Sequence, residues 1–110
     1  MTIANNRMRI AGLCPANTTE NRLYLVPAST QIDAVLRIVN LDTTSQTYRL
    51  AHTATDVAAT TADYLAYNME ILAGDTHEWS IHANAAETIR VLSSTASKIC
   101  YHLSGNKKTW

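Results

Sequence analysis

Short runs in which apolar and polar residues alternate recur along most of this chain. Successive side chains of a β-strand point to opposite faces of the sheet, so a period of two predicts half-buried strands rather than helices. Residues typical of turns separate the runs, among them Pro27, the Asp-Thr-Thr-Ser stretch 42–45 and Gly74-Asp75. This pattern predicts an all-β protein.

Eight runs carry the alternation. The six clearest span residues 22–26, 31–41, 46–52, 76–82, 87–92 and 98–103, and two weaker runs span 8–13 and 64–71. The links between runs are short, so neighbouring strands are expected to be antiparallel. Several of the runs present one apolar face each, which is what two stacked sheets need to close a core. We therefore expect an antiparallel β-sandwich, jelly-roll-like, of about eight short strands.

The length of 110 residues is common for one domain, and we predict a single β-sandwich domain over 1–110. Within it, residues 1–20 are expected to form an N-terminal arm or extra strand, and residues 106–110 a C-terminal tail. The segment 54–66 is rich in Ala and Thr and is predicted to be a long loop with one helical turn, with Asp56 and Asp63 as helix caps.

Composition and charge limit the kinds of partner that the chain is expected to bind. Hydrophobic residues make up 46% and charged residues 16%, which is too apolar for a disordered tail and too interrupted by polar residues for a membrane span. The formal net charge is zero, so the sequence predicts no basic face, no nucleic-acid partner and no membrane partner. Residues 1–9 lack the continuous apolar run of a secretory signal, so synthesis in a cytoplasm is expected.

Residue patterns that carry chemistry are scarce. The chain has no Gly-rich phosphate loop, no nucleophile elbow and no His-Glu-x-x-His. His77 and His82 are five residues apart on one predicted strand, which places them on opposite faces and prevents joint metal binding within one subunit. A metal on a subunit symmetry axis, bound by one His from each copy, is the alternative. We predict a non-enzymatic protein with no catalytic residues, no cofactor and no metal site.

The two cysteines have no metal-type or redox-type spacing. Cys100 lies within an apolar strand pattern, so we expect it to be a small buried hydrophobic residue. A disulfide between Cys14 and Cys100 is the alternative.

The run 31–41 has two apolar faces. Ile32, Ala34, Leu36 and Ile38 form one of them and are expected in the core, whereas Val35, Val39 and Leu41 fall on the other. In an antiparallel sheet this second face needs cover from a loop of the same chain or from a neighbouring subunit.

Three aromatic residues complete the predicted interface. Trp110 follows the last strand and is interpreted as a docking anchor, with a loose or folded-back end as the alternative. Tyr64 lies in the long loop and Tyr67 follows it. Such a loop either makes the contacts of a rigid β scaffold or is a packed crossover that covers one end of the sandwich. The candidate interface residues are Val35, Val39, Leu41, Tyr64, Tyr67 and Trp110.

Five short motifs follow one another in a particular order. They are Leu23-Tyr24-Leu25-Val26-Pro27-Ala28, Ala34-Val35-Leu36-Arg37-Ile38-Val39-Asn40, Tyr64-Leu65-Ala66-Tyr67, Leu72-Ala73-Gly74-Asp75-Thr76 and Ser104-Gly105. This order resembles small structural proteins of tailed phages. Each motif alone is unspecific, and the resemblance rests on their order between Leu23 and Gly105. The first segment, residues 1–20, and the tail after Gly105 depart from the pattern.

The resemblance implies a β-sandwich or jelly roll located on a virion, commonly as a trimer. It implies a capsid decoration (cement) protein that assembles as a homotrimer on the capsid exterior and stabilises the shell. Its partners would be copies of itself and the major capsid protein or other virion proteins. The alternatives are a component of the tail, neck or fibre, or a carbohydrate-binding module for host attachment, for which Tyr64, Tyr67 and Trp110 are the available aromatic residues.

Overall fold

A computed structural model describes residues 4–110 of the chain; residues 1–3, part of the expected N-terminal arm, lie outside the described residues. The predicted runs are all strands. Their bounds are β1 (Ala4–Leu13), β2 (Asn21–Leu25), β3 (Thr30–Asn40), β4 (Gln46–Thr53), β5 (Tyr64–Ile71), β6 (Thr76–Asn84), β7 (Thr88–Ser93) and β8 (Ile99–Thr109), with a single 3-10 turn η1 (Thr61–Asp63) before β5.

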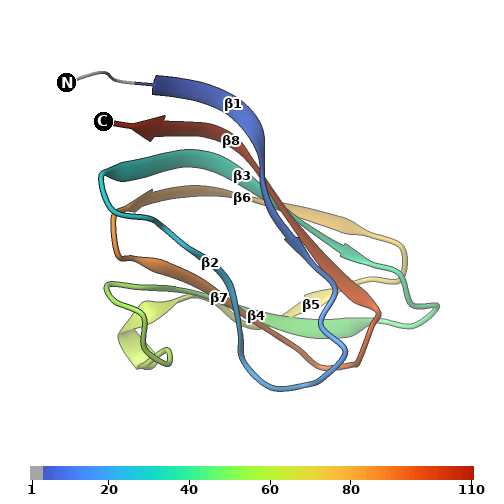
Figure 1. Ribbon diagram of the computed structural model, residues 1–110. Helices are drawn as coiled ribbons and strands as arrows, with labels where there is room; N and C mark the ends of the chain where they lie inside the picture. The colour runs from blue at the N-terminus through green and yellow to red at the C-terminus, as the bar shows by residue number, and fades with distance from the viewer. Residues whose placement is uncertain (1–3) are drawn as a thin grey trace.

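The strands form two four-stranded sheets that lie face to face (Figure 1). Sheet A has the order β1-β8-β3-β6 and sheet B the order β2-β7-β4-β5. The first strand pairs with the eighth, the second with the seventh, the third with the sixth and the fourth with the fifth, all antiparallel. A chain that folds back on itself in this way and then rolls up is a jelly roll. The expected fold class is confirmed.

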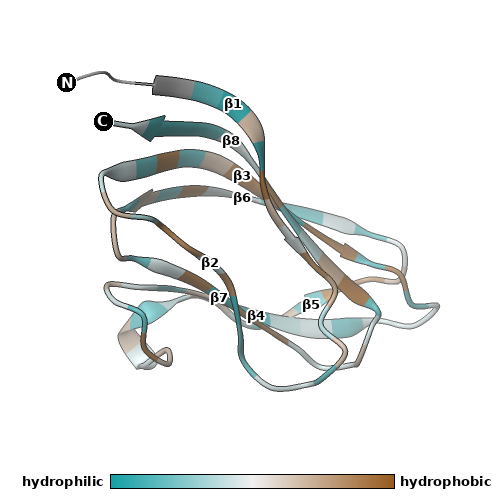
Figure 2. Cartoon of the chain, in the orientation of Figure 1, coloured by the Kyte–Doolittle hydropathy of each residue, from teal (hydrophilic) through white to brown (hydrophobic). Residues whose placement is uncertain are grey.

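The core lies between the two sheets, and strand alternation decides which side chains enter it. In β3, Leu36 and Ile38 are fully buried, whereas Asp33 and Arg37 on the opposite face are exposed. Figure 2 shows the same alternation as brown and teal bands along β3. Buried residues of β8 and β7 meet Leu36 and Ile38 from both sheets, including Tyr101 and Val91. The predicted assignment of the β3 faces is therefore correct.

Tyr101 is 1% exposed, and its hydroxyl lies 2.8 Å from the Ser93 hydroxyl across the core. Burial raises the pKa of Tyr101 to about 12, against a smaller lowering by the Ser93 hydrogen bond. The pKa of Tyr101 in the folded state is raised above its unfolded value of about 10. The contribution of the buried neutral phenol to the free energy of unfolding is therefore fully present below pH ~10. This contribution is lost as the pH rises from about 10 towards 12.

We expect the free energy of unfolding, measured by urea denaturation across a pH series, to fall above pH about 10. Tyr101→Phe should reduce this fall, because phenylalanine cannot ionise. Tyr67→Phe, at a side chain that is 58% exposed, is the matched control and should leave the pH dependence unchanged. A constant stability up to pH about 12 in the unmodified protein would contradict the burial of Tyr101.

The structure joins Cys14 and Cys100 by a disulfide, so the expectation of a small buried hydrophobic residue at Cys100 is wrong. Cys100 is half-buried and Cys14 is exposed. The register explains the bond: Leu13 pairs with Tyr101 across β1 and β8, which brings the next residues on each side, Cys14 and Cys100, to a Cα separation of 4.2 Å. Their sequence separation of 86 residues concealed this proximity.

The expected C-terminal tail is also corrected. Residues 106–109 continue β8, and Trp110 alone follows the strand. Lys107 pairs with Ile32 of β3 on one side and Asn6 of β1 on the other, and Lys108 is likewise paired on both sides. Backbone hydrogen bonds to two neighbours keep this segment extended even though its side chains are polar.

The long loop contains the predicted helical turn, η1, and of the two expected caps Asp63 takes part in its N-terminal capping whereas Asp56 does not. Asp63 is the last residue of η1, and its carboxylate accepts hydrogen bonds from the Thr60 backbone and hydroxyl. Asp56 instead pairs with Arg22 and Arg90 at 2.6 and 2.7 Å. These ion pairs hold the loop against sheet B.

Candidate assembly surfaces

The six predicted interface residues do not form one patch. Val35 and Val39 are half-buried on the outer face of sheet A, and Leu41 is 59% exposed in the loop after β3. Tyr64 and Tyr67 belong to β5 at the edge of sheet B, and Trp110 follows β8 with 41% exposure. The structure therefore distributes the candidate residues over at least three separate surfaces.

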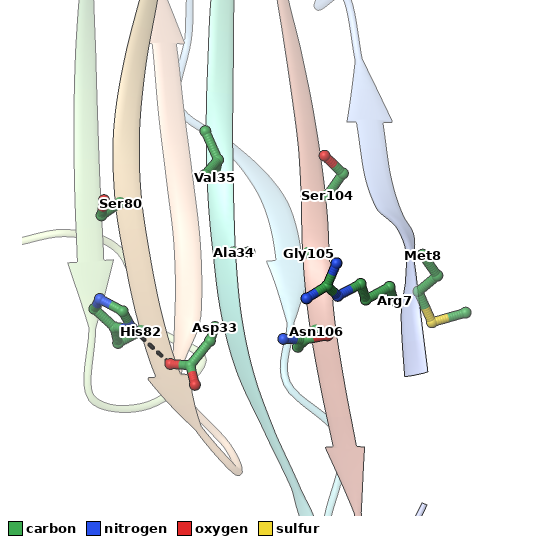
Figure 3. Close-up of a pocket in the computed structure, with 10 residues that line it drawn as sticks. All are labelled: Arg7, Met8, Asp33, Ala34, Val35, Ser80, His82, Ser104, Gly105 and Asn106. Atoms are coloured by element: carbon green, nitrogen blue, oxygen red, sulfur yellow. Dashed lines mark hydrogen bonds and ion pairs between the residues drawn. The ribbon is translucent and has the colours of Figure 1, made fainter. Parts of the chain in front are cut away.

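The outer face of sheet A has an open recess of about 660 Å³ (Figure 3). Its lining residues come from all four strands of the sheet and are Arg7, Met8, Asp33, Ala34, Val35, Ser80, His82, Ser104, Gly105 and Asn106. Cross-strand pairing places one row of these side chains side by side, with Arg7 beside Asn106, Asn106 beside Asp33 and Asp33 beside His82. Val35 thus lies in a recess and not on a flat face.

Glycine forms the floor of this recess. Gly105 has a φ of +155°, and a Cβ atom at this position would overlap the Asp33 carbonyl oxygen and the Ala34 backbone. In Figure 3 the Arg7 side chain extends from β1 across β8 towards Gly105, and Asp33 is hydrogen-bonded to His82 at 2.6 Å. Gly105 therefore lets β8 lie close to β3 beside the buried Ala34.

The β3–β4 and β5–β6 loops form a joined tip at the end of the molecule opposite the two termini (Figure 1). Asn40, which is fully buried, holds them together: its side-chain amide donates to the Thr44 and Ile71 carbonyls at 3.0 and 3.1 Å. Its backbone N–H donates to the Asp75 carbonyl at 3.0 Å, and its carbonyl accepts from Gly74. We call residues 41–45 and 70–75 the Asn40 tip.

A second, smaller hollow of about 550 Å³ lies on sheet B, lined by Ala59, Thr60, Thr61, Tyr64 and Tyr67. The two tyrosine rings meet edge to face with centroids 4.9 Å apart. The Arg49 guanidinium lies 4.0 Å from the Tyr67 ring centroid and also donates to the Asn68 side chain at 2.7 Å. A cation–π contact of this kind keeps the Tyr67 ring in place while leaving it 58% exposed.

Charges are unevenly distributed over the described residues. Arg22, Arg37 and Arg90 pair with carboxylates, whereas none of the ion pairs within residues 4–110 involves Arg7, Arg9, Lys107 or Lys108. These last four lie on β1 and β8, neighbouring strands whose sequences contain no Asp or Glu. We call them the β1/β8 basic edge, and they show that the neutral total charge does not prevent a locally basic surface.

Three of the four histidines, His52, His77 and His82, form side-chain hydrogen bonds. Trp79 donates from its indole to the Tyr48 hydroxyl at 2.9 Å, which leaves the hydroxyl proton for His77 Nδ1 at 2.8 Å. This network joins β6 to β4 across the two sheets, while His82 lies on the outer face of sheet A, as the odd spacing predicted. Within residues 4–110, no three His, Cys, Asp or Glu side chains gather closely enough to hold a metal ion.

No helix within residues 4–110 combines the length and hydrophobicity that crossing a membrane requires. No family model matches the chain, and no curated protein matches its sequence. Among solved structures, the coat protein of Tobacco streak virus is similar in fold, with a TM-score of 0.56 over 98% of this chain and 86% of that chain. Only 6% of the aligned residues are identical, so the likeness concerns the fold. The class defined here is therefore the eight-stranded jelly roll, shared with a viral coat protein.

Proposed function

We propose that this protein is a non-enzymatic structural component of a virion. The observation that carries the proposal is its jelly roll, which resembles a viral coat protein over nearly the whole chain. The order of sequence motifs between Leu23 and Gly105, which resembles small tailed-phage structural proteins, supports the same role. More specifically, we propose a capsid decoration protein that assembles as a homotrimer on the capsid exterior, with the major capsid protein as a further partner.

Exposed apolar side chains support assembly. Seven of the eight large exposed apolar side chains among the described residues fall at three places: Leu41 and Leu72 at the Asn40 tip, Leu65, Tyr67 and Met69 on β5, and Met8 and Trp110 near the termini. The eighth of these, Val57, lies apart from them in the loop before η1. Single exposed apolar residues are common on monomers, but groups of them mark contact surfaces. Burial against neighbouring subunits would stabilise a domain of this small size.

Two measurements test this proposal. An image reconstruction of the intact particle should show the protein in three-fold clusters on the outside of the shell. Purified protein should be trimeric by sedimentation or light scattering, because the grouped apolar residues gain cover on association. Density in the tail, neck or fibre would support the alternative location, and a monomer at particle-like concentrations would contradict the trimer.

A carbohydrate-binding module for host attachment is the second candidate, favoured by the hollow beside Tyr64 and Tyr67. Sugar rings stack on exposed aromatic faces, but the Arg49 guanidinium already covers one face of Tyr67. A glycan array without binding would remove this candidate. Binding that is lost in Tyr67→Ala would support it.

A further inference from the structure

The Asn40 tip and the outer face of sheet A complement each other in shape and charge. We infer that the Asn40 tip of one copy docks head-to-tail into the recess and the β1/β8 basic edge of a second copy. This inference rests on the proposed function, because it names the contact through which copies would assemble. Neither surface is used in the fold of the single chain.

The Asn40 tip is built as a rigid projection. The buried Asn40 amide donates to the Thr44 and Ile71 carbonyls and accepts from the Asp42 backbone. These bonds fix both loops before any partner arrives, so docking them would cost little conformational entropy. The same arrangement holds Leu41 and Leu72 outside, with exposed fractions of 59% and 57%. A rigid loop pair that exposes two leucines is suited to filling a depression on another protein.

The recess offers a matching shape. Gly105 lets β8 and β3 approach closely, and the apolar side chains Met8 and Val35 line the depression beside it. Met8 is 44% exposed and projects at the edge of sheet A in Figure 3. These groups would cover the leucines of the tip, which a flat polar sheet face could not do.

Opposite charges surround the two surfaces. The tip carries Asp42, Glu70 and Asp75; Lys98 acts on Asp42, and His77 Nε2 lies 3.8 Å from the Asp75 carboxylate. With histidine counted as neutral, three carboxylates against one ammonium leave a charge of −2. The β1/β8 basic edge carries four cations without carboxylate partners among the described residues, against one carboxylate in the recess, Asp33, which is hydrogen-bonded to His82. Attraction between these surfaces would set the orientation and the rate of association.

The positions of the two surfaces exclude contact within one molecule. Val35 in the recess pairs with Ser104, which also pairs with Arg9, and Asn40 is five residues further along β3, so about 17 Å at 3.3 Å per residue separates the recess from the tip. A contact between two different surfaces is heterologous, and rings with three-fold symmetry require contacts of this kind. The proposed homotrimer therefore needs two complementary surfaces such as these.

The first test removes the apolar part of the tip. Leu41→Ser combined with Leu72→Ser should weaken self-association, measured as a dissociation constant by sedimentation velocity, by at least about tenfold, because both side chains lose buried area. Val57→Ser is the matched control, since Val57 is 54% exposed in the loop before η1. The control should leave the dissociation constant and the melting temperature unchanged.

The second test exchanges charges. Arg7→Glu with Arg9→Glu, and separately Glu70→Lys with Asp75→Lys, should each weaken self-association about tenfold or more at low salt. Mixing the two variants should restore binding between them, because the reversed tip of one then faces the reversed edge of the other. Restoration on mixing is not expected if the substitutions merely damage the fold.

The outcomes separate the two proposals. If the unmodified protein assembles but both pairs of variants assemble equally well, the head-to-tail contact is wrong while the virion role stands. If it is monomeric at all concentrations, the contact is overturned together with the trimer. If Arg7→Glu with Arg9→Glu abolishes binding of a short labelled oligonucleotide but not self-association, the basic edge is a polyanion site, which also overturns the inference.

Discussion

Replacing Cys14 and Cys100 by serine is expected to lower the free energy of unfolding by about 4 kcal/mol. The bond joins residues 86 positions apart and therefore restricts the unfolded chain over most of its length. In the chain-entropy description, a loop of this size stabilises the folded state by about 4.6 kcal/mol, and measured values are often somewhat smaller. The melting temperature should fall by about 15 °C.

Urea and thermal unfolding of the oxidised protein and of the double-serine variant measure this difference. A reductant should lower the stability of the unmodified protein to that of the variant, and should leave the variant itself unchanged. Equal stabilities with and without reductant would show that the two sulfurs are not bonded in the folded protein. The Cys14→Ser single variant exposes Cys100 as a free thiol for a labelling control.

Substituting Gly105 by alanine should lower the free energy of unfolding by about 4 kcal/mol, through two effects that add. The φ of +155° is strained for any residue with a Cβ, and the new methyl group would overlap the Asp33 carbonyl and the Ala34 backbone. Because β8 is hydrogen-bonded to β1 and to β3 at this point, it cannot move away without breaking one of the two ladders.

Gly74→Ala is the matched control for Gly105→Ala. Gly74 has a φ of +72° in the turn before β6, but nothing lies within 4 Å of a Cβ placed there, so only backbone strain of about 1 kcal/mol is expected. Thermal unfolding of the two variants separates strain from overlap. Equal losses in both variants would show that β8 and β3 are not in close contact at Gly105.

Strand positions and core faces followed from local alternation. In β3, Leu36 and Ile38 are buried because every second residue of a strand faces the same side, a rule that needs no knowledge of the partner strands. The same rule cannot predict where a strand ends when its last residues carry no apolar alternation. Residues 106–109 have no apolar alternation, and only their pairing with β1 and β3 keeps them in a strand.

The sequence predicted single residues that need cover, but not how these residues group into surfaces. Leu41 and Val35 were both predicted to need cover, yet the structure places Leu41 on the tip and Val35 in the recess on sheet A. Asn40 is the last but one residue of the predicted run 31–41, and nothing local reveals that its amide reaches the Ile71 carbonyl, 31 residues further along the chain. No signal in the sequence pointed to the recess, since its lining residues come from four strands that only the sheet order brings together.

The sequence by itself determined which segments are strands, which side of each strand is apolar and that the chain is a two-layered β protein. These properties are local, because they depend on the order of side chains along an extended backbone. The tertiary structure alone decided the Cys14–Cys100 bond, the joined tip and the basic edge formed by β1 and β8. Each of these depends on strand order and register, which bring together residues from distant parts of the chain and so are set by the packing of the whole domain.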